Sequence, residues 1–218
     1  MSAARPPAPN TGTSLTGDRV TAAVERALDD RQREATEEVE RILAAAVRVM
    51  ERVAPEPPRV SDIVTEAGSS NKAFYRYFAG KDDLILAVME RGVAIVVSYL
   101  EHQMAKESRP ADQVARWIEG TLAQVADPHL ISMSRAAAGQ LSAATNWRAA
   151  DQEMMRPLRD LLLTPVAALG STDVDRDVDA VFDCTAATMR RYVGSADRPG
   201  PDDIAHVVRF CLHGLGVG

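Results

Sequence analysis

A short basic stretch between Gly68 and Lys81 holds the side chains with the clearest chemical use. It contains Lys72, Arg76 and Lys81 and no acidic residue, whereas the whole 218-residue chain has a formal net charge of -6. Cations that replace phosphate counterions supply much of the affinity of proteins for DNA. The positive charge of this stretch is therefore the first indication of a nucleic-acid partner, although the overall charge alone argues against one.

The residues that could read and position DNA fall within and just before this stretch. Asn71 and Lys72 open a predicted short helix, where their side chains can reach base edges, since Asn pairs with adenine and Lys with guanine in the major groove. Ala73 follows them on the predicted base-reading surface. Phosphate contacts fix the position of a helix without reading sequence. The residues expected to make them are Ser61, Ser70, Tyr75, Tyr77 and Lys81.

Two short helices joined by a glycine turn are needed to position these side chains. The first is expected over residues 60–67, and Gly68 stops it by taking the left-handed cap conformation. Ser70 is suited to cap the second, over residues 71–78, which Gly80 closes. This order predicts a helix-turn-helix, whose second helix enters the major groove.

An aromatic cluster in the second helix has two explanations. Phe74, Tyr75, Tyr77 and Phe78 fall within five residues, and apolar groups at helical spacing usually belong to a core. Phe74 and Phe78 share one face at i, i+4 and are expected to pack on the first helix. The glycine turn, serine cap, tyrosines and lysine occur together in one register, which favours DNA binding over a solvated basic face.

The stretch from Glu37 to Leu84 resembles the TetR family of bacterial transcriptional regulators. The Phe-Tyr-x-Tyr-Phe run and the lysine after the next glycine are in the register of that family. Two positions depart from it, because the family usually has valine where Ser69 stands and threonine where Ala73 stands. The first change weakens the packing of the turn, and the second removes a hydroxyl contact to DNA. The matching positions are Val60, Ile63, Ala67, Gly68, Ser70, Phe74, Tyr75, Tyr77, Phe78, Lys81 and Leu84.

The resemblance implies a helical body that binds a small-molecule ligand and forms a homodimer. The last two helices, expected over residues 173–192 and 202–215, would pair with those of a second subunit in a four-helix bundle. Both have apolar stripes that support this pairing; alternatively, the stripes belong to the subunit's own core. In the family the pocket lies among the body helices, and aromatic and methionine side chains suit a large apolar ligand. The candidate pocket residues are Trp117, Met133, Arg135, Trp147 and Met154.

The hydrophobic pattern of the whole chain predicts an all-α fold, since no alternating strand pattern occurs. A long helix is expected to begin at Asp82 and to join the helix-turn-helix to the body. Gly92, midway along it, offers a place to bend, although close packing is the preferred interpretation. Further helices are expected over residues 111–126, 128–141 and 147–169, the last interrupted or kinked near Pro157 and Pro165.

The chain divides into four parts on this pattern. Residues 1–17 are rich in Pro, Ala, Thr, Ser and Gly, a composition that predicts a disordered tail. Residues 18–36 form a charged helical extension. A helix-turn-helix DNA-binding domain follows over residues 37–81, and a helical ligand-binding and dimerisation domain over residues 82–218.

Other classes of protein lack support in the sequence. Cys184 and Cys211 are too few for a disulfide scaffold, and the four histidines have no metal-ligand spacing. No apolar run approaches the roughly 20 residues of a membrane span, and no nucleophile elbow, phosphate loop or pair of catalytic carboxylates is visible. We therefore expect a cytoplasmic protein that is not an enzyme, needs no cofactor or metal and does not enter a membrane.

Two functions stay open on the sequence. The first is a transcriptional repressor that an unknown small-molecule ligand releases from a palindromic, double-stranded DNA operator. The second is a helical ligand-binding or interaction protein whose DNA binding is weak or lost through Ser69 and Ala73. The salt dependence of binding to genomic fragments distinguishes the two.

Overall fold

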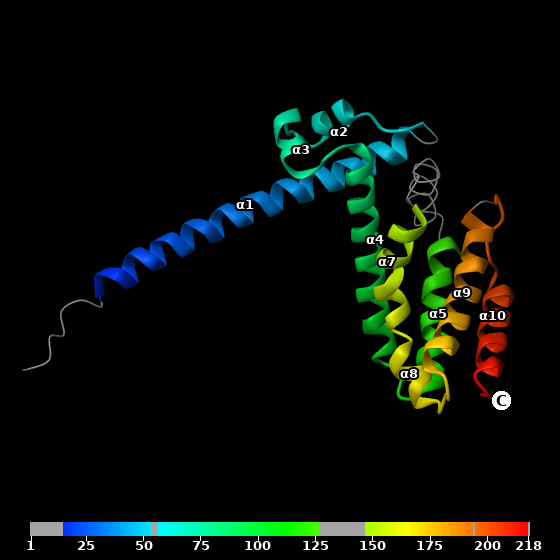
Figure 1. Ribbon diagram of the computed structural model, residues 1–218. Helices are drawn as coiled ribbons and strands as arrows, with labels where there is room; N and C mark the ends of the chain where they lie inside the picture. Colours follow the sequence, from blue (N-terminus) through cyan, green and yellow to red (C-terminus); the bar gives the residue numbers. More distant parts are fainter. Residues whose placement is uncertain (1–14, 54–55, 127–146, 194, 218) are drawn as a thin grey trace, which may run out of the picture.

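The protein is helical throughout the residues that the computed structural model describes, which are 15–53, 56–126, 147–193 and 195–217. It has a small head and a helical body, and one long helix, α4 (Lys81–Met104), runs from the first into the second (Figure 1). The predicted all-α fold is confirmed. None of the described helices is both long and apolar enough to span a membrane.

The head combines the C-terminal part of α1 (Leu15–Val53) with α2 (Val60–Glu66), α3 (Asn71–Tyr77) and the start of α4. The apolar residues of α1 recur every three or four positions, so that they form one face that the other helices cover. The core of the head contains Ile42, Leu43, Ala46, Val49, Met50, Ile63, Val64, Phe74, Phe78, Leu84 and Val88.

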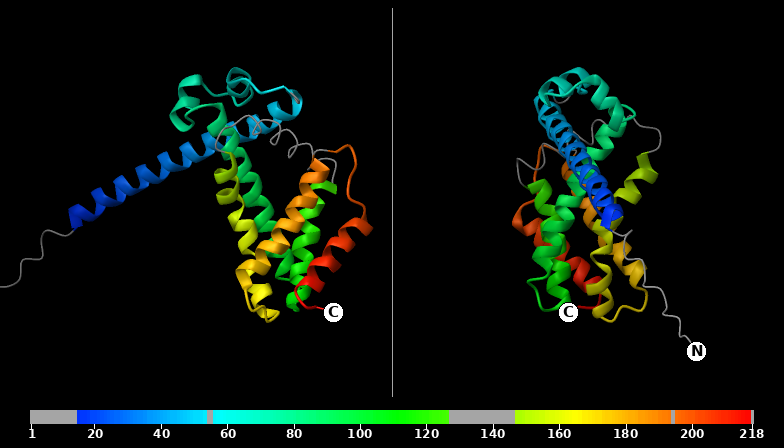
Figure 2. Two further views of the ribbon diagram at one scale, coloured as in Figure 1. Left: turned by 45° about the vertical axis from the view of Figure 1, so that its right-hand side comes forward. Right: turned by 90° about the vertical axis from the view of Figure 1, so that its left-hand side faces the viewer.

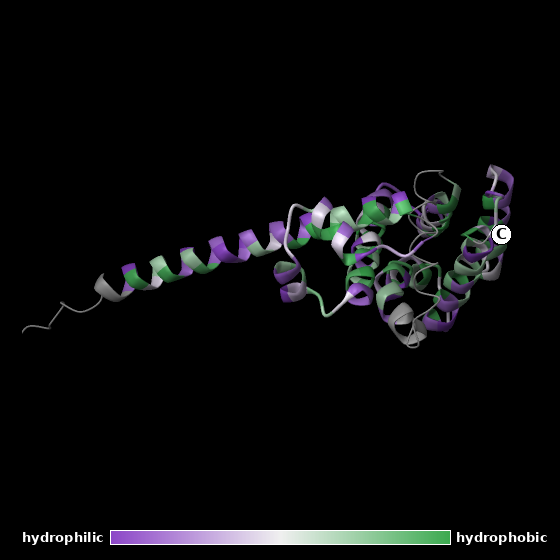
Figure 3. Ribbon diagram, turned by 90° about the horizontal axis from the view of Figure 1, so that it is seen from above, coloured by the Kyte–Doolittle hydropathy of each residue, from purple (hydrophilic) through white to green (hydrophobic). Residues whose placement is uncertain are grey.

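The N-terminal part of α1 extends away from the head as the continuation of the same helix (Figures 1 and 2). Polar and apolar residues alternate along it (Figure 3). Val20, Val24 and Leu28 stay 61%, 54% and 56% exposed. The residues expected to form a charged extension are thus helical and continuous with the first helix of the head.

The body packs around α5 (Pro110–Ala126), which contacts α4, α8 (Leu163–Ala168), α9 (Val174–Val193) and α10 (Pro201–Gly214). Because helices surround α5, its buried residues occur on several sides of the helix. They are Val114, Trp117, Ile118, Gly120, Thr121, Leu122 and Val125.

The interruption predicted within residues 147–169 falls between the two prolines. Pro157 lies inside α7 (Trp147–Asp160), and the helix ends before α8 begins at Leu163. Pro165 lies in the first turn of α8, where the missing N–H of proline is tolerated. The helix predicted over residues 128–141 lies outside the described residues.

Candidate nucleic-acid interface

The turn between α2 and α3 has the backbone geometry that the sequence predicts. Gly68 adopts a φ of +59°, a left-handed conformation that residues other than glycine rarely adopt. Ser70 then caps α3, because its hydroxyl accepts a 3.1 Å hydrogen bond from the Ala73 N–H. The glycine turn and the serine cap together fix where α3 begins and how it leaves α2.

The inner half of α3 anchors the helix in the head. Phe74 is fully buried and Phe78 is 6% exposed, and their ring centroids lie 5.6 Å apart. Both belong to the core that α1, α2 and α4 complete, as predicted. Ala73 is also on this side and is 3% exposed. Its contact with a base stays a prediction, and this buried position does not favour it.

The outer half of α3 presents polar side chains to solvent. Asn71, Lys72 and Arg76 are exposed, and Tyr75 is 61% exposed. At 100° per residue these four positions share one side of the helix, opposite the buried Ala73 and Phe74. The structure therefore gathers four polar side chains on the surface that the helix-turn-helix prediction assigns to DNA.

Glu38 of α1 organises the back of α3, a role that the sequence did not reveal. Its Oε2 accepts a 2.9 Å hydrogen bond from the Tyr77 hydroxyl, and its Oε1 accepts a 3.3 Å bond from the Ser69 hydroxyl. The Arg76 guanidinium lies 3.7 Å from Oε2. The hydroxyl of Tyr77, predicted to contact phosphate, thus points to a carboxylate within the head, and its role on DNA stays a prediction.

The hydroxyl of Ser69 compensates in part for the valine that the turn lacks. A valine would fill space, whereas serine adds a polar group that needs a partner when half-buried. Glu38 supplies that partner. No local pattern pointed to this contact, because 31 residues separate the two positions.

A second carboxylate, Glu66 at the end of α2, ties that helix to α1. It accepts a 2.9 Å hydrogen bond from Arg48 Nε and a 3.0 Å bond from Arg52 Nη1. These two guanidinium groups lower the pKa of Glu66 below its ordinary value. The pair of arginines, one helical turn apart on α1, therefore holds the first helix of the helix-turn-helix in place.

The remaining predicted phosphate contacts lie at the edges of the motif. Ser61 is exposed in the first turn of α2, where its hydroxyl lies 3.4 Å from Asp62 Oδ1. Lys81 opens α4 and is half-buried. Asp83 accepts a 2.9 Å bond from the Ala79 N–H, which fixes the chain just before Lys81.

Helix α4 belongs to both cores, so the head cannot move independently of it. Leu84 and Val88 are buried in the head, and Leu100 and Met104 are buried in the body. The preferred interpretation of Gly92, close packing, is wrong: a Cβ added there would meet no other atom within 4 Å. A side chain at this point of α4 would find open space.

The segment that contains the helix-turn-helix matches the model of a known protein family. Residues 42–88 match the family model of bacterial regulatory proteins, tetR family. By this match the head belongs to the tetR family of bacterial regulatory proteins. Among curated proteins, none matches this sequence significantly.

Solved structures extend the TetR-family likeness from the head to the whole fold. FadR from Bacillus subtilis, in complex with stearoyl-CoA, is 18% identical with a TM-score of 0.61 over 81% of this chain and 96% of that chain. A TetR-family regulator from Mesorhizobium loti is 13% identical, with a TM-score of 0.65 over 83% and 96%. RolR in complex with resorcinol is 17% identical, with a TM-score of 0.62 over 85% and 91%. At these identities the comparison shows a shared fold.

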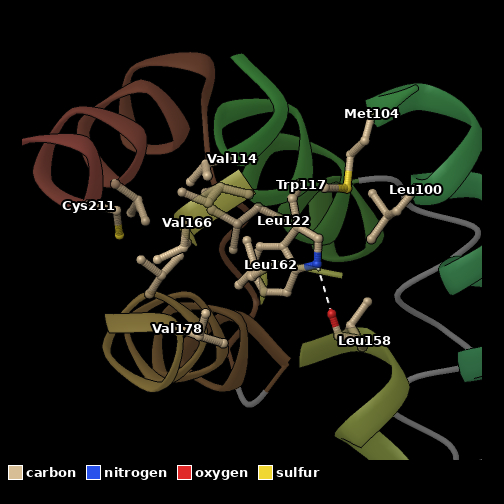
Figure 4. Close-up of a cluster of buried hydrophobic side chains, with 13 residues drawn as sticks. Leu100, Met104, Val114, Trp117, Leu122, Leu158, Leu162, Val166, Val178 and Cys211 are labelled. Atoms are coloured by element: carbon tan, nitrogen blue, oxygen red, sulfur yellow. Dashed lines mark hydrogen bonds between the residues drawn. The ribbon is translucent and has the colours of Figure 1, made fainter. Parts of the chain in front are cut away.

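Trp117 and Met154 are the two predicted pocket residues whose side chains the structure describes, and they lie in different places. Trp117 is 1% exposed and lies among the buried side chains of the body, where its Nε1 donates a 2.9 Å hydrogen bond to the Leu158 carbonyl (Figure 4). Met154 instead lines an open groove between α4 and α7. Trp147 is the first residue of α7, and Met133 and Arg135 lie outside the described residues.

The apolar stripes of the last two helices face the subunit's own core, which was the alternative that the sequence left open. Val178 and Val181 of α9, and Val207 and Cys211 of α10, are buried together with α5 and α8. The stripes therefore give no independent support for dimerisation. What α9 and α10 present to solvent is a different set of residues, with Phe210 64% exposed.

Proposed function

We propose that the protein is a transcriptional repressor that binds a palindromic DNA operator as a homodimer and is released from it by a small molecule. The observation that carries this proposal is the set of exposed polar side chains on the outer half of α3. Within the described part of the chain, the side chains of Asn71 and Lys72 form no hydrogen bond or ion pair, so neither has an internal contact to give up when DNA is bound. A rigid core beneath them reduces the ordering cost on binding.

The outer residues of α9 and α10 support pairing of two subunits. Ala180, Asp183, Ala187 and Arg190 lie exposed on α9, with small residues that allow close approach. In a two-fold interface each patch meets itself, so antiparallel α9 helices would bring Asp183 near Arg190 of the second copy. The exposed Phe210 of α10 would add apolar area at such an interface.

Release of DNA by a ligand requires a physical link between body and head, and α4 supplies one. A dimer reads a palindrome only when its two recognition helices lie about 34–36 Å apart, or at a matched multiple. A ligand that tilts α4 changes that spacing, because Leu84 and Val88 fix its first turns in the head. The ligand must bind the released state more tightly, and coupling of about 1–3 kcal/mol is typical.

The fold does not specify the chemistry of the ligand. FadR is described with stearoyl-CoA and RolR with resorcinol, two molecules that differ widely in size and charge. We infer that this protein also takes a ligand in its body and that it acts on DNA in the cytoplasm.

Selection of genomic DNA fragments on the purified full-length protein tests the function. We expect tight binding to one or a few palindromic sites, with affinity that falls steeply as salt increases. The variant Lys72→Ala should lose this binding, whereas Lys106→Ala, an equal charge change in the turn after α4, should retain it. Uniformly weak binding to all fragments would instead support an interaction protein without an operator.

A further inference from the structure

An open groove of about 650 Å³ lies between α4 and α7 of the body. The two helices run side by side in Figures 1 and 2. Val93, Ala94 and Val97 of α4 line it together with Met154 of α7. These three residues of α4 lie within about one helical turn, so that they share one face and form a continuous apolar floor.

Three carboxylates border this apolar floor. Glu90 and Glu101 lie on the same face of α4, eleven residues and hence about 16 Å apart along the helix axis. Glu153 lies opposite them on α7. The described residues that line the groove include no lysine or arginine.

These carboxylates are largely free to meet a bound charge. Within the described residues Glu90 and Glu101 form no ion pair. Glu153 pairs with Arg156 at 3.1 Å, but the two side chains are 80% and 62% exposed, and an exposed pair of this kind contributes little free energy. Across the described part of the chain, the rim of the groove therefore carries negative charge that is largely left without a paired cation.

We propose that the α4–α7 groove binds an organic cation with an apolar body. Charge complementarity decides the class of ligand. Burial of the apolar body of a ligand against the floor is favourable. The three carboxylates attract a positive charge and repel a negative one. An anionic ligand of the same size would place its charge among carboxylates. The inference rests on the proposed function in taking the groove as the ligand site of a regulator.

The position of the groove connects its occupancy to the head. Glu90 lies two residues beyond Val88, which is buried in the head core. The opposite wall is held in place, because Arg159 of α7 contacts Asp179 of α9 at 2.6 Å and Asp175 at 3.0 Å. A molecule that fills the groove therefore acts on α4 more readily than on α7.

Binding of tetraphenylphosphonium to the full-length protein, without DNA, tests this inference. Tetraphenylborate provides a near-isosteric anion, and triphenylphosphine oxide provides a neutral aromatic control. We expect the cation to bind and to raise the midpoint of thermal unfolding, and the anion not to bind. The double variant Glu90→Gln/Glu101→Gln should weaken cation binding by about fivefold or more, the range of two partly exposed charge contacts.

Two further variants separate local from general effects. Glu25→Gln/Glu51→Gln removes the same charge from exposed positions of α1 and should leave cation binding unchanged. Ala94→Trp fills the floor of the groove from an exposed position and should abolish binding without lowering thermal stability.

Equal affinity for the cation and the neutral control would overturn the inference, and so would cation binding that survives both Ala94→Trp and the double groove variant. Operator affinity is then measured with and without the cation. Selective cation binding that leaves operator affinity unchanged contradicts ligand release but not the cation site. Operator release by a neutral or anionic molecule alone contradicts the cation site but not ligand release.

Discussion

The hydroxyl of Tyr77 donates a 2.9 Å hydrogen bond to Glu38, which joins the end of α3 to α1 across 39 residues of sequence. We expect Tyr77→Phe to lower the free energy of unfolding by about 0.5–1.5 kcal/mol, because it leaves a half-buried carboxylate without one donor. Urea unfolding measures this change. In the double variant Glu38→Gln/Tyr77→Phe, the change in the free energy of unfolding should differ from the sum of the two single changes.

The same substitution decides between two roles of Tyr77. If the hydroxyl serves the interior of the head, Tyr77→Phe lowers stability and affects DNA binding only to a similar extent. Normal stability combined with a large, salt-dependent loss of DNA affinity would contradict this structural role and support the predicted phosphate contact.

Lys81 is expected to bind phosphate without reading sequence. Lys81→Ala should weaken binding to all operator variants alike and reduce the slope of log affinity against log salt by about 1. Fluorescence anisotropy with a panel of operator variants measures both quantities. A loss confined to particular base substitutions would show that Lys81 reads sequence.

Asn71 is expected to show the opposite behaviour. Its exposed side chain lies at the N-terminal end of α3, where Asn can pair with adenine. Asn71→Ala should relax preference at one or two base pairs, at a cost of about 1–3 kcal/mol for the preferred base. Selection of binding sites from random DNA tests this, and recovery of the unchanged wild-type consensus would exclude Asn71 from base reading.

The sequence could predict the head because its determinants are local. Gly68 and Ser70 set the turn through their own backbone and hydroxyl, and Phe74 and Phe78 mark the buried face of α3 by their spacing. The contacts of Glu38 could not be predicted in this way, since its partners lie 31 and 39 residues away. Long-range carboxylate contacts depend on how helices cross, which periodicity alone does not give.

The body was harder to interpret for a related reason. An apolar stripe shows that a helix buries one face, but it does not show whether the covering surface belongs to the same subunit or to a second one. Trp117 shows the same ambiguity, because an aromatic residue in a body helix suits a pocket or a core equally well. The groove between α4 and α7 depends on the packing of two helices that are distant in sequence.

Cys211 is expected to react slowly with thiol reagents. Burial raises the pKa of its thiol from an ordinary 9.0 to about 12, with further contributions from the charge of Cys184 and a hydrogen bond with it. Little thiolate is then present near neutral pH. Iodoacetamide labelling followed at each cysteine should modify Cys211 far more slowly in the folded protein than in urea.

The same pKa gives a dependence of stability on pH. The folded state holds the Cys211 proton more tightly than the unfolded chain does, so that its contribution is complete below pH 9.0 and decreases as the pH rises toward about 12. Cys211→Ala should remove this alkaline dependence. Rapid labelling of Cys211 in the native protein would contradict the raised pKa.

Gly92 and Gly120 offer a matched test of how α4 is held. A Cβ at Gly92 meets no atom within 4 Å, so Gly92→Ala should raise the free energy of unfolding by about 0.5–1 kcal/mol through the helix preference of alanine. A Cβ at Gly120 would collide with Leu100 Cδ2, a buried side chain of α4. Gly120→Ala should therefore destabilise the body by about 1–3 kcal/mol, the usual cost of overpacking.

The pair also tests whether α4 must bend at Gly92 to transmit a signal. Chemical unfolding gives the two stabilities, and operator affinity with and without ligand gives the coupling. If bending is required, Gly92→Ala gains stability and loses ligand response, since alanine stiffens the helix at that point. An unchanged ligand response in the stabilised variant would mean that α4 moves as a rigid rod, fixed in the body by the contact between Leu100 and Gly120 and in the head by Leu84 and Val88.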